Sequence, residues 1–127
     1  MSDLAGTWKL VEVRAFDDVG RGEPPPLGQH PMGIMVFESD RMLGAVCDGS
    51  AALAPGASSR AFGSYCGTYT FDGLELVTKV DGASTPTLLA DQVRHIRFDG
   101  PSRMRINPVA GALGNQNHFE LIWERIG

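Results

Sequence analysis

Long hydrophobic runs are absent from this sequence, and so are clusters of basic residues. No apolar stretch approaches the roughly 20 residues that cross a bilayer, and no charged segment followed by an apolar one marks an export signal near residue 1. The 11 Lys and Arg are outnumbered by 15 Asp and Glu, which gives a net charge of −4. We therefore expect a cytoplasmic protein that has neither a membrane nor a nucleic acid as its partner.

Cysteine is also scarce, with Cys47 and Cys66 as the two thiols of the chain. They lie in segments that read as neighbouring strands, so a disulfide between them is one interpretation. Two free, buried thiols in a reducing compartment is the other, which we favour. Neither residue has a His or a second Cys at zinc-finger spacing, and Gly20-Arg21-Gly22 lacks the helix that a phosphate loop needs. No cofactor is therefore expected.

Sustained helical periodicity is missing as well, and short segments with strand patterning take its place. The length of 127 residues suits one domain, which we assign to the whole of 1–127. Eight segments have the composition and alternation of strands. They are residues 7–16, 32–37, 42–48, 64–71, 74–81, 93–98, 103–106 and 117–126.

Turn signals between these segments indicate how the strands connect. Asp72-Gly73 is the clearest two-residue hairpin turn, because its glycine accepts a positive φ. The Pro-rich stretch 17–31 and the Ala- and Gly-rich stretch 49–62 are too long for simple turns and are candidate lids. Eight strands in sequence predict an all-β, eight-stranded antiparallel up-and-down β-barrel, since closure leaves no exposed edge. A β-sandwich is the structural alternative.

Several short motifs follow one another in a fixed order over nearly the whole chain. They are Gly6-Thr7-Trp8-Lys9-Leu10-Val11, Pro25-Pro26-Leu27-Gly28, Pro31-Met32-Gly33, Ser39-Asp40-Arg41-Met42, Tyr65-Cys66-Gly67-Thr68-Tyr69, Gln92-Val93-Arg94 and Leu121-Ile122-Trp123-Glu124-Arg125. In this order and spacing they resemble the lipocalin-like domain family of small bacterial and fungal proteins. The resemblance implies a barrel related to the lipocalins, in which Trp8 closes one end and Arg125 packs across its indole.

Strand parity selects the side chains that point into such a barrel, because alternate residues of a strand share a face. On the first strand, the face of Trp8 and Leu10 also carries Glu12 and Arg14, so we expect both charges to point inward. The other side chains expected inside are Met35, Phe37, Met42, Val46, Tyr65, Tyr69, Leu76, Thr78, Arg94, Ile96, Phe98, Met104, Ile106, Phe119 and Leu121.

An apolar interior with a few convergent polar groups is typical of small-molecule sites. Arg94 would bind a carboxylate, enol or phenol, and the tyrosine hydroxyls would orient it. An inward Glu12 would pair with Arg94 or with the ligand, because an unpaired buried charge destabilises the fold strongly. The favoured prediction is therefore the binding of a small, largely apolar molecule inside the barrel.

Three alternatives accompany this prediction. In a cofactor-independent isomerase or cyclase acting on a polyketide- or terpenoid-like substrate, Glu12 would be the general acid or base, beside Arg94 and Tyr69. In a solidly packed barrel, the 32–47 hairpin, apolar on both faces, would form a homodimer interface. A metal site of His95, His118 and Glu120 is the third, but parity places both histidines on the outer face, so no metal is predicted.

Overall fold

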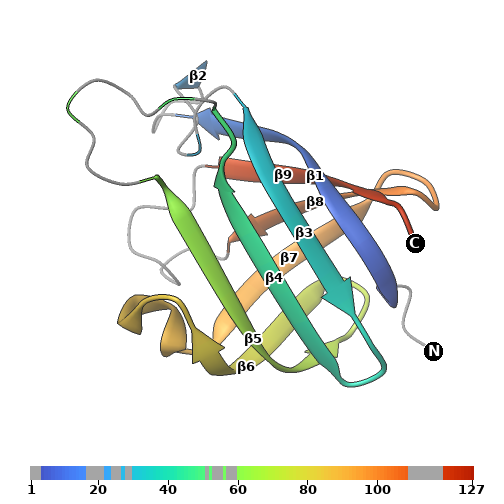
Figure 1. The fold of residues 1–127 in the computed structure, drawn as a ribbon. Coiled ribbons are helices and arrows are strands. Elements are labelled where there is room, and N and C mark those ends of the chain that lie inside the picture. Colours follow the sequence, from blue (N-terminus) through green and yellow to red (C-terminus); the bar gives the residue numbers. More distant parts are fainter. Residues whose placement is uncertain are drawn as a thin grey trace.

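The computed structural model describes residues 4–16, 22–23, 27, 30–50, 52, 56, 60–108 and 119–127. These residues form nine strands and one 3₁₀ turn (Figure 1). The elements are β1 (Gly6–Phe16), β2 (Gly22–Glu23), β3 (Pro31–Phe37), β4 (Arg41–Asp48), β5 (Phe62–Phe71), β6 (Glu75–Ala83), η1 (Pro86–Leu89), β7 (Gln92–Phe98), β8 (Arg103–Pro108) and β9 (Phe119–Arg125).

A single antiparallel sheet runs in the order β1-β3-β4-β5-β6-β7-β8-β9, and β9 returns to pair with β1. This closure is an eight-stranded up-and-down barrel, so the predicted fold class is confirmed. The two-residue β2 lies inside the stretch predicted as a loop and pairs with the end of β1, Ala15 facing Glu23. The rest of the two predicted lids falls mostly outside the described residues.

Connection lengths alternate around the barrel and make its two ends different. The β3–β4, β5–β6 and β7–β8 connections are tight turns, in which Glu38 N donates to Arg41 O at 2.8 Å and Asp99 N donates to Arg103 O at 2.9 Å. Gly73 and Gly100 have positive φ in two of these turns. All three turns lie at the same end as the start of β1 and the end of β9, whereas η1, in the β6–β7 connection, lies at the opposite end (Figure 1).

Trp8 closes the end that carries the tight turns. The Arg125 guanidinium carbon lies 4.3 Å from the centroid of the Trp8 ring, a cation–π contact of about 0.5–2 kcal/mol. The indole N–H donates to Leu4 O at 3.0 Å, and Arg125 Nη1 donates to Ala5 O at 2.6 Å. The arrangement of Trp8 and Arg125 that the resemblance implied is therefore confirmed.

The expectation that Glu12 and Arg14 point inward is wrong. The β1–β9 ladder shifts register between Leu10 and Glu12, so that Leu10 faces Trp123 while Glu12 faces the next residue, Ile122. This β-bulge gives β1 one extra residue, Val11, and reverses the parity beyond it. Val13 is consequently buried, and the side chains of Glu12 and Arg14 are about half exposed on the outside.

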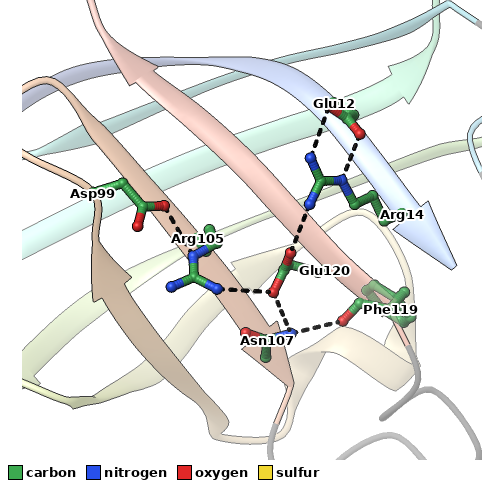
Figure 2. A network of polar contacts seen from close by, with 7 residues as sticks. All are labelled: Glu12, Arg14, Asp99, Arg105, Asn107, Phe119 and Glu120. Atoms are coloured by element: carbon green, nitrogen blue, oxygen red, sulfur yellow. Dashed lines mark hydrogen bonds and ion pairs between the residues drawn. The ribbon is translucent and has the colours of Figure 1, made fainter. Parts of the chain in front are cut away.

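The outward charges form a connected network over the seam of the barrel (Figure 2). Glu12 pairs with Arg14 at 2.6 Å, and Glu120 lies 3.7 Å from Arg14 and 3.8 Å from Arg105. Arg105 continues to Asp99 at 2.9 Å. The network joins β1, β9 and β8 on their outer face, and it therefore supports the pairing that closes the barrel.

The close approach of β5 and β6 can be tested by a substitution at Gly67. A Cβ at Gly67 would lie 2.1 Å from the carbonyl oxygen of Lys79, which is backbone and has no room to move aside. We expect Gly67→Ala to lower the free energy of unfolding by about 1–3 kcal/mol, the usual range for overpacking. Urea unfolding followed by circular dichroism measures this change.

Gly63→Ala on the same strand is the matched control. Its Cβ would meet Leu88 Cδ1 at 3.6 Å, an ordinary van der Waals contact. It should therefore leave the unfolding midpoint nearly unchanged. Equal midpoints for the two variants would contradict the close approach at Gly67.

Candidate functional site

A cavity of about 210 Å³ lies in the half of the barrel away from the tight turns, where β4 ends and β5 begins. Its lining comes from β3 to β9 and from η1. The lining residues are Met35, Gly44, Ala45, Val46, Gly63, Ser64, Tyr65, Leu76, Leu88, Arg94, Ile106, Phe119, Leu121 and Trp123. Leu27, from the Pro-rich stretch, packs against the edge of the buried cluster.

Two glycines make room for this cavity. Gly44 faces Met35 across the β3–β4 ladder, and Gly63 faces Val46 across the β4–β5 ladder, both at inward positions. Neither has a side chain that could fill the interior, although β-strands usually place branched or aromatic residues there. The wall formed by β4 and β5 is therefore backbone at these two positions, between the side chains of Val46 and Tyr65.

Eight of the residues predicted to lie inside line the cavity. They are Met35, Val46, Tyr65, Leu76, Arg94, Ile106, Phe119 and Leu121. Six others are buried or partly buried in the closed half instead: Phe37, Met42, Tyr69, Ile96, Phe98 and Met104. Thr78 is buried on β6, opposite Gln92, without lining the cavity. Glu12 and Arg14 lie outside the barrel. The predicted parity was right for all of these residues except Glu12 and Arg14. Parity does not, however, report the position of a residue along the barrel axis.

Tyr69 belongs to the closed half. Its ring packs edge-on against Phe37 at a centroid distance of 5.2 Å, and its hydroxyl donates to the carbonyl of Glu38 in the β3–β4 turn. The hydroxyl is therefore engaged away from the cavity. Tyr69 contributes to packing there, and the structure does not bring it together with Arg94 or Glu12.

Arg94 is the one charged residue among the described residues that line the cavity. Its Nη1 donates to its neighbour Val93 O at 3.0 Å, and its Nη2 donates to Gln92 Oε1 at 2.7 Å. Burial lowers the pKa of Arg94, because desolvation disfavours the charged form, while Tyr65 acts in the opposite direction. Arginine nevertheless stays protonated in proteins, so the cavity holds a positive charge.

No described carboxylate pairs with this charge. The ion pairs of the described residues lie on the outer face, and the one predicted partner, Glu12, is among them. The predicted Glu12–Arg94 pair is therefore absent. Arg94, which is partly buried, instead depends on neutral acceptors, which compensate a cation less well than an anion does.

Gln92 is a site residue that the sequence interpretation missed. It is 1% exposed, and its Nε2 donates to Ala90 O at 2.8 Å and to Leu88 O at 3.4 Å. The amide is thus fixed by the connection that contains η1, and its Oε1 in turn holds the guanidinium of Arg94. The spacing of two residues on one strand face was the available signal, because it places Gln92 beside Arg94.

Two more donors face the interior. Burial raises the pKa of Tyr65, while the charge of Arg94 opposes that rise, so the hydroxyl is protonated at neutral pH. The indole Nε1 of Trp123 is buried and has no hydrogen-bond partner among the described residues, and the same holds for Thr78 Oγ1. Trp123 lines the cavity, whereas Thr78 faces Tyr69 across the β5–β6 ladder and Gln92 across the β6–β7 ladder.

Histidine and cysteine contribute nothing to the cavity in the part of the chain that is described. His95 is on the outer side of β7, 3.7 Å from Glu75, and His118 falls outside the described residues. No described group of three or more His, Cys, Asp or Glu side chains is placed to hold a metal. Cys47 and Cys66 are free thiols and face Phe62 and Leu43 respectively, rather than each other.

Comparisons with known proteins report on the fold. No family model and no curated protein matches the chain. Among solved structures it is similar to a redesigned β-barrel, with 14% sequence identity, a TM-score of 0.50 and coverage of 98% of this chain and 93% of the other. At this identity the likeness concerns the barrel alone. Separately, no helix in the described ranges is long and apolar enough to span a membrane.

Glu12 offers a test of its outward position. The hydrogen bond from Arg14 lowers the pKa of Glu12 below its ordinary 4.5. This carboxylate therefore stabilises the fold above pH 4.5, and the contribution disappears as the pH falls through the lower folded value. We expect Glu12→Gln to be slightly less stable than wild type at neutral pH, because the pair is half exposed.

Urea unfolding at a series of pH values measures this difference. The two midpoints should converge as the pH falls below 4.5. Glu38→Gln, which removes an exposed carboxylate outside the network of Figure 2, is the control and should show a smaller gap at neutral pH. A gap that widened on acidification would contradict the ion pair.

Proposed function

We propose that this protein binds a small, largely apolar molecule in the interior of a lipocalin-like barrel. The observation that carries the proposal is the cavity itself, whose described lining is apolar apart from Arg94, Tyr65, Ser64 and the indole N–H of Trp123. Apolar walls with a few polar groups bind ligands by removing apolar surface from water and orient them by the polar groups.

The size of the cavity limits the ligand. An apolar cavity of about 150 Å³ takes up benzene, so about 210 Å³ suits one ring with a short side chain, or a chain of similar bulk. Long acyl chains and multi-ring molecules exceed this space. The proposed ligand is therefore a small molecule with a single ring or a short chain.

Binding is favoured over the isomerase or cyclase alternative because the assigned acid or base is not in the cavity. Glu12 is outside the barrel, and no described carboxylate or imidazole lines the interior. The cavity also argues against the alternative in which the interior of the barrel is solidly packed. The homodimer and the cytoplasmic location stay predictions. The outer face of β3, β4 and β5 does expose Met32, Leu43 and Phe62, as the apolar hairpin pattern indicated.

Filling the cavity tests the proposed function. A leucine at Gly63 would extend into the space beside Leu88 and Val46, where a Cβ meets only an ordinary contact. We expect Gly63→Leu to fold and to weaken binding of 3-phenyl-1-propanol by about 10- to 100-fold, equivalent to about 1–3 kcal/mol of overpacking against the ligand. Isothermal titration calorimetry measures the affinity.

Thr70→Leu is the matched control, because it adds the same side chain to the exposed outer face of β5. Its affinity for 3-phenyl-1-propanol should equal that of the wild type. Unchanged binding in Gly63→Leu would show that the probe binds elsewhere, and no binding to any variant would reject the proposed function.

A further inference from the structure

The cavity lining contains several hydrogen-bond donors but no described side-chain carboxylate or amide. A guanidinium has five N–H groups, and Arg94 uses one on Nη1 and one on Nη2, which leaves three without a described acceptor. The hydroxyl of Tyr65 and the indole N–H of Trp123 add two more donors in the same lining. No described lining residue has a carboxylate or a side-chain amide that would accept from them.

A buried donor without an acceptor destabilises the protein, and more so when the donor is charged. Trp123 is 2% exposed, and its Nε1 has no partner in the described residues. Among the described residues, the partly buried charge of Arg94 therefore has no carboxylate partner and the Trp123 N–H has no acceptor. Each would be stabilised by an anionic acceptor placed among Arg94, Tyr65 and Trp123.

From this arrangement we infer that the cavity selects a monocarboxylate, whose head group is bound by Arg94 and Tyr65 while Gln92 positions the guanidinium. The inference rests on the proposed function and names its ligand class. A carboxylate brings two acceptor oxygens with about four lone-pair sites, and it fits the planar fork of a guanidinium. It also supplies the negative charge that the described protein does not.

Competing head groups fit less well. A neutral phenol or enol leaves the charge of Arg94 uncompensated and adds a further donor to a site already rich in donors. A dicarboxylate would neutralise Arg94 and bury a second charge among Met35, Leu76 and Ile106, where no cation can pair with it. One positive charge in an apolar pocket matches one carboxylate.

Gln92 contributes to the proposed preference for a monocarboxylate, and a single substitution at this position should remove that preference. Its Oε1 is 2.7 Å from Arg94 Nη2, so a carboxylate at this position would neutralise Arg94 from within. Gln92→Glu keeps the size of the side chain and the acceptor for Arg94, while its second oxygen replaces the Nε2 that donates to Ala90 O and Leu88 O. It therefore removes the need for an anionic ligand without removing the cavity, and Gln92 is in this sense a positioning residue.

The test compares probes that share one ring. 3-Phenylpropanoate, its neutral amide and benzylmalonate, which adds a second carboxylate, are titrated by calorimetry and by the fluorescence of the two tryptophans, of which Trp123 lines the cavity. We expect the monocarboxylate to bind about 10- to 100-fold tighter than the amide, the range for hydrogen bonds to charged groups. Benzylmalonate should bind more weakly than 3-phenylpropanoate.

Two variants assign this preference to the site. Arg94→Met and Gln92→Glu should each bind the amide as wild type does and lose the preference for the carboxylate. Arg97→Met, on the exposed side of the same strand, is the control and should keep it. Circular dichroism verifies the fold of each variant. If only one of Arg94→Met and Gln92→Glu folds, that variant alone is sufficient to test the inference.

Three results would overturn the inference. They are equal affinities for the carboxylate and the amide, a preference that survives in Arg94→Met, and tighter binding of benzylmalonate than of 3-phenylpropanoate. In each case the amide or 3-phenyl-1-propanol still binds, so the proposed function stands. If no probe binds, charged or neutral, the proposed function fails and the inference fails with it.

Discussion

Pairing between the first and last strands is the constraint on which the rest of this structure depends. Without the β1–β9 ladder the sheet would be open, and its concave face would be a surface with no interior. Closure is reinforced on both sides of the seam. Arg125 packs on Trp8 inside, and the charges of Glu12, Arg14 and Glu120 connect β1 to β9 outside. The bulge at Val11 moves two of those charges outward, so the same irregularity protects the seam and keeps the interior apolar.

The closed barrel then divides into two halves with different tasks. Tight turns lie at the half filled by Trp8, Phe37 and Tyr69, where aromatic packing and the engaged hydroxyl of Tyr69 leave little freedom. The other half lies away from the tight turns and contains the cavity with Arg94. A rigid half holds the register, which allows the other half to accommodate an unpaired charge that a uniformly packed core would not tolerate.

The sequence predicted the architecture well because strand alternation and turn chemistry are local signals. The side chains predicted to lie inside kept their parity on every strand but the first, the second register shift of the sheet lies beyond Val80 on β6, and Asp72-Gly73 forms the turn that its composition indicated. The first strand failed at Val11, since a bulge is set by the partner strand and leaves no mark in the alternation of β1 alone. The error mattered because it moved Glu12, and with it the predicted acid or base, out of the barrel.

The candidate site was predicted in part for a related reason. Arg94 and Tyr65 were identified by parity, but height along the axis depends on stagger between strands, so Tyr69 and Phe98 were expected at a cavity that they do not reach. Loop lengths held an unused signal, because short and long connections alternate and thereby distinguish the two ends. The role of Gln92 depends on the path of the η1 connection, which no pattern in the strand itself reveals.

Gly44 and Gly63 affect the entropy that is lost when a ligand contacts the wall of this pocket. Where they line it, the wall is main chain held by ladder hydrogen bonds on both sides. Such a wall has no rotamers to freeze when a molecule arrives, so contact with it loses no side-chain entropy. The opposite wall, with Phe119 and Leu121, consists of side chains that can adjust. The pocket thus combines one fixed surface that defines a shape with one adaptable surface that closes around whatever fits it.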